Sequence, residues 1–164
     1  MAAGAFVISL DFELFWGMRD KRTLAEYGAH IRGVRAALPS MLEAFERYGV
    51  KATFATVGLL YHGQRADLMK ALPTERPSYR NTALSPYHGH FDTIGQNEQD
   101  DPHHFGASLV QLVLAHPQHE VACHTFSHYY CLEEGQTAEQ FRADLRAAER
   151  AAGLFGVKRN SLVF

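Results

Sequence analysis

The sequence predicts an α/β fold with parallel strands, and three observations lead to that prediction. Short apolar runs typical of buried strands occur at residues 5–10, 50–57 and 119–123. Between the first two runs, residues 31–48 show the spacing of an amphipathic helix. A strand, a helix and a second strand closed by glycine form a βαβ unit, whose two strands pair in parallel. The length of 164 residues fits one domain.

The first run ends in two carboxylates. Residues 5–10 are almost wholly apolar, as expected of a strand covered on both faces. Asp11 and Glu13 come next, and the two-residue period of a strand predicts that their side chains share one face. Residues 18–29 are charged and irregular, so a loop is predicted there.

The segment 31–48 is predicted to be helical because apolar residues recur at three- and four-residue steps, at Leu38, Leu42 and Phe45. Pro39 suits a first helical turn, so either the main helix begins near Leu38 or an earlier helix bends at the proline. Gly49 is expected to end the helix. The strand at 50–57 follows and ends at Gly58.

The middle of the chain contains a long irregular stretch. A weakly helical segment at 59–72 leads into residues 73–102, which are rich in Pro, Gly, Ser, Asn and Asp. An irregular stretch of this length is more often a functional excursion than filler. Asp101 and Pro102 match an N-cap and a first helical residue, so a helix is predicted from there to about His116.

Three elements are predicted in the last part of the chain. The strand at 119–123 leads directly into His124. Thr137 is expected to cap a helix at 138–152 whose buried face carries Phe141, Leu145, Ala148 and Ala152. Residues 161–164 are expected to start a fourth strand.

Composition excludes several classes of protein. The net charge of −2 gives no electrostatic case for binding nucleic acid or an anionic membrane. Cys123 and Cys131 do not form a disulfide framework. Asp11 interrupts the first apolar run too early for a signal peptide or a membrane span, so we expect the chain to stay in the cytoplasm. Nothing in the sequence indicates an oligomeric state.

His124 and His128 are the strongest candidates for chemistry. Ten histidines among 164 residues give roughly one such pair by chance, so the spacing alone favours a structural role. Two facts shift the balance: the pair follows a predicted strand, and another strand end carries carboxylates. On a helical turn both imidazoles could reach one cation, with Glu13 as the third ligand. Two His and one carboxylate form a catalytic zinc set with a fourth position open for water.

These segments resemble a known family, the polysaccharide deacetylases of carbohydrate esterase family 4, which share the NodB-homology domain. Residues 9–13 look like its first motif, residues 49–54 resemble its second strand, and residues 120–128 match its His-[Ser/Thr]-x-x-His motif. One departure is that the commonest first motif has two adjacent Asp residues, whereas here Phe12 separates Asp11 from an acid that is Glu13.

The resemblance implies roles for individual residues. Asp11 would be the catalytic base, and Glu13, His124 and His128 would bind a divalent metal, for which zinc is the expected ion. Thr125 would use its hydroxyl to brace the loop that carries the two histidines.

The resemblance also implies an architecture. The chain would be the first part of an irregular (β/α) barrel with parallel strands, truncated at the C-terminus. Residues 1–164 would then be the N-terminal part of a single deacetylase-like catalytic domain. The family's general-acid His and base-orienting Arg would lie beyond Phe164, so residues 1–164 are expected to bind metal and to turn over slowly.

The function implied is that of a metal-dependent hydrolase that removes N-acetyl groups from an acetylated amino sugar or glycan precursor, a non-peptide C–N amide. Two alternatives stay open. One is a non-catalytic domain that binds metal or glycan. The other is an amidohydrolase of the same fold that acts on a small non-sugar amide.

Several other residues have weaker claims to function. His88, His90 and Asp92 could line a sugar groove, although solvated loop positions are the favoured interpretation. Four further histidines are predicted to lie on the surface: His103, His104, His116 and His119. Aromatic residues near the site could stack on a sugar or pack in the core; these are Phe12, Trp16 and Tyr129. Cys123 is predicted to be a small buried residue.

Overall fold

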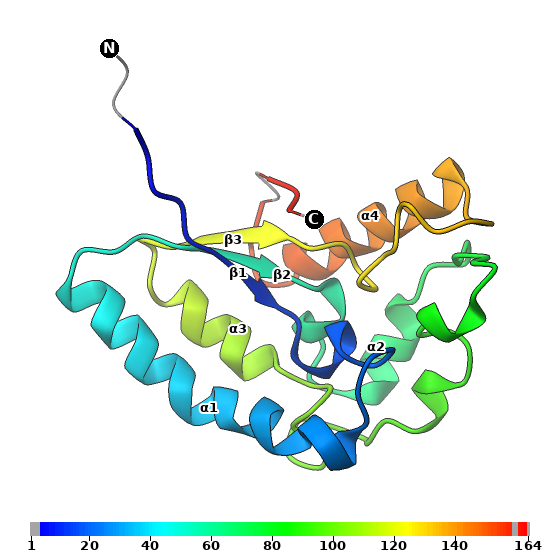
Figure 1. Ribbon diagram of the computed structural model, residues 1–164, viewed down its shortest axis with the longest axis horizontal. Helices are drawn as coiled ribbons and strands as arrows, with labels where there is room; N and C mark the ends of the chain where they lie inside the picture. Colours follow the sequence, from blue (N-terminus) through cyan, green and yellow to red (C-terminus); the bar gives the residue numbers. More distant parts are fainter. Residues whose placement is uncertain (1–3, 159–160, 164) are drawn as a thin grey trace.

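The structure, a computed structural model, describes residues 4–158 and 161–163. At its centre is a three-stranded parallel sheet with the order β1-β2-β3 (Figure 1). The strands are β1 (Ser9–Phe12), β2 (Thr53–Thr56) and β3 (Glu120–Cys123). The predicted α/β class and parallel pairing are therefore confirmed, with strands shorter than the apolar runs.

Beside β3, Leu162 forms an isolated parallel bridge with Cys123. Its neighbours contribute two backbone hydrogen bonds, from Cys123 N to the Ser161 carbonyl (3.1 Å) and from Val163 N to the Cys123 carbonyl (2.9 Å). The predicted fourth strand is thus present as one bridge at the outer edge of β3, and its last residue, Phe164, lies outside the described residues.

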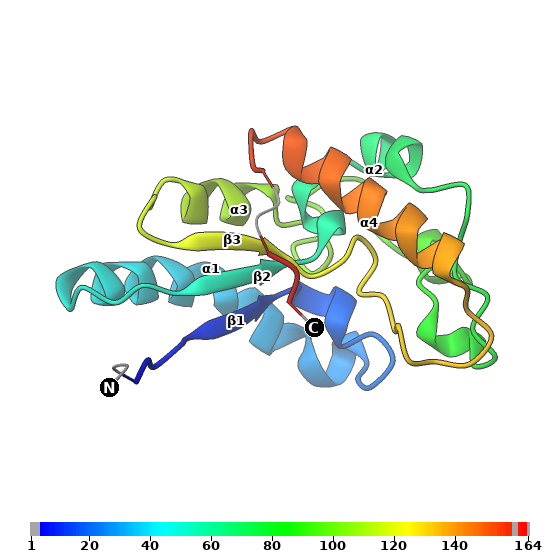
Figure 2. The same cartoon turned by 90° about the horizontal axis from the view of Figure 1, so that it is seen from above.

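The described residues form four α-helices: α1 (Leu24–Arg47), α2 (Arg65–Ala71), α3 (Ala107–Leu114) and α4 (Ala138–Gly153). Helices α1 and α3 lie side by side below the strands in Figure 1, and Figure 2 shows α4 running past the carboxyl end of β3. Short 3₁₀ helices fill the connections: η1 (Leu14–Gly17), η2 (Gly58–Tyr61), η3 (Thr82–Leu84) and η4 (His90–Asp92). Within the described ranges, no helix combines the length and apolar character that a membrane crossing needs.

Helix α1 begins earlier than predicted. Thr23 and Glu26 form a capping box in which each side chain meets the other's backbone N–H. The loop predicted at 18–29 is therefore wrong over its second half, and Pro39 lies well inside the helix. Gly49, at φ 64, follows the helix in the left-handed conformation that glycine adopts readily.

The sheet buries one face of β1 and leaves the other open. Phe12 is buried in the main hydrophobic core, whereas Ser9 and Asp11 are exposed. Phe6 and Val7, 91% and 75% exposed, precede the strand altogether. The prediction of a first strand covered on both faces is therefore wrong, because the alternating side chains of β1 meet the core on one side only.

Two helix predictions need correction. Asp101 caps no helix; its carboxylate accepts hydrogen bonds from the backbone N–H groups of Gly95, His103 and His104, which closes a turn instead. Helix α3 consequently begins at Ala107. Helix α4 begins after the Thr137 cap as predicted, but its buried face is rotated. The buried residues are Asp144, Ala147, Ala148, Ala151 and Ala152, so the prediction is confirmed for Ala148 and Ala152, whereas Phe141 and Leu145 are only partly buried.

Candidate metal centre

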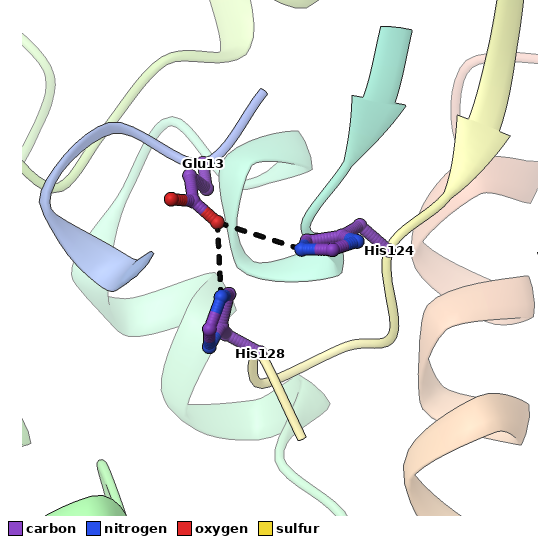
Figure 3. Close-up of side chains that lie close together, drawn as sticks. All are labelled: Glu13, His124 and His128. Carbon is purple, nitrogen blue, oxygen red and sulfur yellow. Dashed lines mark ion pairs between the residues drawn. The ribbon is translucent and has the colours of Figure 1, made fainter. Parts of the chain in front are cut away.

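Three side chains from distant parts of the chain meet beyond the carboxyl ends of the strands (Figure 3). Glu13 Oε2 lies 3.0 Å from His128 Nε2 and 3.5 Å from His124 Nε2. All three donor atoms lie within 4.8 Å of one another. In the part of the chain that the structure describes, this is the one group of three or more His, Cys, Asp or Glu side chains close enough to hold a metal ion.

Glu13 reaches this position through a turn. Strand β1 ends at Phe12, and Glu13 (φ −138, ψ −11) begins the η1 turn. Its side chain folds back over Gly17, where an added Cβ would lie only 1.9 Å from the Glu13 carboxyl carbon. The position of the Glu13 carboxylate therefore does not follow from the strand alternation used in the prediction. It depends on the absence of a side chain at residue 17.

Gly17→Ala is expected to weaken metal binding by at least about tenfold with little loss of stability. The new methyl group displaces a flexible carboxylate rather than backbone, so the fold tolerates it while a metal ligand moves away. Titration of metal into the chelated protein and a thermal melt measure the two effects. Gly33→Ala is the matched control, because a Cβ on Gly33 meets nothing within 4 Å. Unchanged affinity in the Gly17 variant would contradict this account of how Glu13 is held.

The two histidines are brought together by an irregular turn. Residues 124–128 contain no helix, and both Thr125 (φ 62) and His128 (φ 53) adopt left-handed backbone conformations. The prediction of a helical turn is therefore wrong, although both imidazoles do face the Glu13 carboxylate. A left-handed β-branched residue costs on the order of 1–3 kcal/mol, so neighbouring contacts must hold this turn.

Hydrogen bonds from the turn itself and from η2 supply part of that support. The Thr125 hydroxyl accepts a hydrogen bond from Tyr129 N (2.8 Å), in line with the bracing role expected of it. Gly58 N and Leu59 N donate to the carbonyls of Thr125 (2.8 Å) and Phe126 (3.0 Å). The approach is so close that a Cβ on Gly58 would lie 2.8 Å from the Phe126 Cα.

Asp144 on α4 supplies the rest, and the sequence analysis missed it. Its carboxylate accepts a hydrogen bond from Phe126 N at 2.7 Å and others from the backbone and hydroxyl groups of Ser127. Burial raises the Asp144 pKa to about 6, although these donors oppose the shift. The available signal was its register: Asp144 precedes Ala147, Ala148 and Ala151 at helical spacing, which marks the buried stripe once α4 is rotated.

The electrostatics of the centre favour a positive charge beside Glu13. Burial raises the pKa of Glu13, but the two neighbouring imidazoles outweigh that effect and bring the pKa to about 2. Burial lowers the pKa of His124, whereas Glu13, the Val163 carbonyl and Asp11 together raise it above its usual value. Carboxylate and imidazoles therefore stabilise a cation between them, either a proton or a metal ion.

The donor set fits a divalent metal. His124 Nδ1 lies 2.8 Å from the Val163 carbonyl, which fixes the hydrogen on Nδ1 and turns the Nε2 lone pair toward Glu13. Glu13 Oε2 and His128 Nδ1 are buried and receive no hydrogen bond of good geometry. Two imidazole nitrogens that face one unsatisfied carboxylate oxygen can share a bound cation with it, and His₂Glu is a zinc donor set.

Asp11 lies next to this group on the open face of the sheet. Together with His124, Thr125, His128 and Tyr129 it lines a hollow of about 240 Å³. The Asp11 carboxylate also contributes to the raised pKa of His124, so its charge acts at the centre. The structure thus places all four predicted site residues around one hollow or directly beside it.

Three of the predictions about other histidines were wrong. His104 and His119 are 2% and 9% exposed rather than on the surface. His104 Nδ1 contacts Asp101 Oδ2 at 2.7 Å and its Nε2 contacts His90 Nε2 at 3.1 Å, so His90 is no solvated loop residue. His119 Nδ1 accepts a hydrogen bond from Ala52 N.

Three other predictions concern buried residues near the site. Phe12 and Trp16, 6% and 0% exposed, pack in the core rather than offering a stacking surface. Tyr129 is also buried but lines the hollow beside Asp11. Cys123 is buried as predicted, and like Cys131 it forms no disulfide.

Comparison with known proteins identifies the family of the chain. A family model described as polysaccharide deacetylase matches residues 27–163, most of the chain. The matched span includes His124 and His128 and begins after Asp11 and Glu13. No curated protein and no solved structure matches the chain.

Proposed function

The chain belongs to the polysaccharide deacetylase family, and from that premise we propose that it is a metal-dependent hydrolase that removes N-acetyl groups from an acetylated amino sugar or glycan precursor. The observation that carries the proposal is the meeting of Glu13, His124 and His128 beside the hollow that Asp11 lines. Hydrolysis by an activated water needs a metal held by such a set of ligands and a general base that is not itself a ligand.

In this proposal Glu13, His124 and His128 hold the ion, and zinc is the ion that two imidazoles and one carboxylate favour. A divalent metal bound there would supply Lewis acidity, polarising the acyl oxygen and activating water near neutral pH. The Val163 carbonyl orients the His124 ring by accepting a hydrogen bond from Nδ1. The hydrogen bonds from η2 and to Asp144 hold the turn that carries both imidazoles.

Asp11 is proposed as the general base. Its side chain is exposed on the open face of β1. It borders the hollow that the two histidines also line. From there it can accept the proton of the attacking water while the three ligands stay occupied with the metal. A base that is not itself a ligand separates proton transfer from metal binding, which makes the two roles separable by mutation.

We also propose that residues 1–164 form the N-terminal part of a deacetylase-like barrel domain. Support comes from the parallel order β1-β2-β3 and from the bridge between Leu162 and Cys123, which places residues 161–163 where the next parallel strand would lie. The candidate site then lies outside the carboxyl ends of the strands, as sites do in parallel barrels.

Release of acetate from a panel of substrates tests the function. The panel contains N-acetylglucosamine, its short oligomers and a non-sugar acetamide such as an N-acetyl amino acid, incubated with zinc and the full-length encoded protein. We expect acetate from one or more of the sugars. Acetate from the amino acid alone would favour the amidohydrolase, and no acetate from a zinc-loaded protein would favour a domain that only binds metal or glycan.

A further inference from the structure

The guanidinium of Arg19, which forms no ion pair with the described residues, lies near the candidate metal centre. The Arg19 guanidinium donates to the carbonyls of Trp16 and Leu84, the latter at 2.5 Å. Its Nε is buried and has no hydrogen-bond partner. No ion pair of Arg19 occurs within residues 4–158 and 161–163, which include the ion-paired arginines 35, 47, 80 and 142. A cation that is partly removed from water and satisfied only by carbonyls retains its capacity for an anion.

Arg19 borders a hollow of about 330 Å³. Polar side chains surround it, and none of its lining residues is acidic; they are Arg19, Ala83, Ser85, His88, Gly89, His90 and Thr93. Asp20 is the neighbouring carboxylate whose charge acts on Arg19, but the two form no ion pair. The hollow therefore combines the Arg19 guanidinium with the Ser85 hydroxyl and the His88 imidazole, groups that can donate to carboxylate and phosphate oxygens.

A chain of buried contacts fixes the imidazole of His90 at the edge of this hollow. Asp101 Oδ2 contacts His104 Nδ1 at 2.7 Å, so that nitrogen carries the hydrogen. His104 Nε2 then accepts from His90 Nε2 at 3.1 Å. Burial, His104 and the positive charge of Arg19 lower the pKa of His90 to about 4. The positive charge of Arg19 therefore acts on the imidazole at the edge of the hollow, although Asp101 opposes that effect.

The aromatic ring of Tyr130 contacts both Arg19 and His128. The ring centroids of His128 and Tyr130 lie 5.2 Å apart. Arg19 Cζ lies 5.7 Å from the centroid of the same Tyr130 ring. Arg19 and His128 are therefore both neighbours of one ring, and a sugar that contacts both places would extend past this ring.

We propose that the hollow lined by Arg19, Ser85, His88 and Thr93 binds a carboxylate or phosphate group of the same sugar whose acetamido group lies at Glu13, His124 and His128. This inference rests on the proposed function and narrows its substrate to anionic acetylated amino sugars. Arg19 supplies the charge, the Ser85 hydroxyl and the His88 imidazole supply further donors, and His90 closes one wall.

Equilibrium binding of three matched sugars tests the proposal, measured by NMR titration at pH 7.5 and low salt. The probes are neutral N-acetylglucosamine, N-acetylglucosamine 6-phosphate and 2-acetamido-2-deoxyglucuronic acid. The protein is used both zinc-loaded and after chelation, so that attraction of an anion to the metal is separated from attraction to Arg19. We expect at least one anionic sugar to bind about tenfold or more tightly than the neutral one in both forms. The sugar that is preferred distinguishes phosphate from carboxylate.

Two variants test whether the preference for anionic sugars arises in the hollow beside Arg19. Arg19→Gln removes the cation, and His88→Glu places a carboxylate in the lining at an exposed position where folding is not at risk. Both are expected to reduce the preference to about twofold or less. The matched controls, Arg146→Gln and His30→Glu at exposed positions on α4 and α1, should keep it.

Equal binding of all three sugars would overturn the proposal, and so would a preference that survives in His88→Glu or in a folded Arg19→Gln protein. These outcomes are independent of acetate release. A protein that prefers anionic sugars but releases no acetate would refute the proposed function and leave this site standing. Acetate release without any preference for anionic sugars would support the proposed function and refute this binding site.

Discussion

Replacing His124 or His128 by Ala is expected to abolish stoichiometric metal binding. Each variant leaves one imidazole and Glu13, and two protein ligands seldom hold a catalytic metal. Wild-type protein purified without chelator should contain about one zinc or similar divalent ion per chain by elemental analysis. The variants should contain only traces after the same purification.

His30→Ala is the matched control, because it removes an exposed imidazole on α1 that lies outside the centre. It should keep the metal. If either single variant, or a double variant with both His124→Ala and His128→Ala, retained stoichiometric metal, the ion would be bound elsewhere and the centre would be misassigned. Wild-type protein without any metal would contradict the account equally.

Asp11→Asn is expected to lower turnover by about a hundredfold or more while the metal stays bound, measured in the full-length encoded protein. An amide of the same shape cannot accept the proton of the attacking water, and loss of a general base costs about 10²- to 10⁴-fold. The measurements are acetate release under substrate saturation and metal content of the same sample. Because Asp11 is exposed, the substitution should leave folding unaffected.

Loss of metal together with activity would show that Asp11 is itself a ligand, and the role of Glu13 would then need revision. Full activity of the Asn variant would remove Asp11 from the mechanism. Asp92→Asn is a suitable control, since it makes the same change at another exposed acid that does not line the hollow beside His124.

The strand order could be predicted because it depends on patterns local to each segment. Three apolar runs separated by helical stretches predict parallel pairing without any knowledge of contacts. The extent of β1 could not be predicted, because exposure of Phe6 and Val7 depends on what covers the sheet. The start of α1 was missed although the Thr23–Glu26 capping box is visible in the sequence, since charged residues on either side concealed it.

The turn at Asp101 shows how side-chain contacts override a local signal. Asp followed by Pro is a good helix start, yet the carboxylate at 101 is engaged by Gly95 and by the ring of His104. Gly95 comes within reach of Asp101 only when the irregular stretch before Asp101 has folded, so this contact cannot be predicted from the local sequence. The burial of His104 against His90 has the same origin and has no signature in the spacing of residues.

The candidate site was predictable as a set of residue types and unpredictable as a geometry. His124, His128, Asp11 and Glu13 follow from strand ends and from the resemblance to a family. Their placement depends on close contacts instead: Gly17 makes room for the Glu13 carboxylate, and Asp144 holds the histidine turn from a helix that follows it in sequence. Such contacts involve residues that carry no chemistry of their own, so no motif marks them.

The most direct test of the account is restoration of activity by metal. The full-length protein is chelated, then titrated with zinc while acetate release from an acetylated amino sugar is followed. Acetate release should be absent in the chelated protein, rise linearly with added zinc and reach its plateau at about one ion per chain, and the His128→Ala protein should stay inactive throughout. Full acetate release by the chelated protein, or restoration of the His128→Ala protein by zinc, would contradict it.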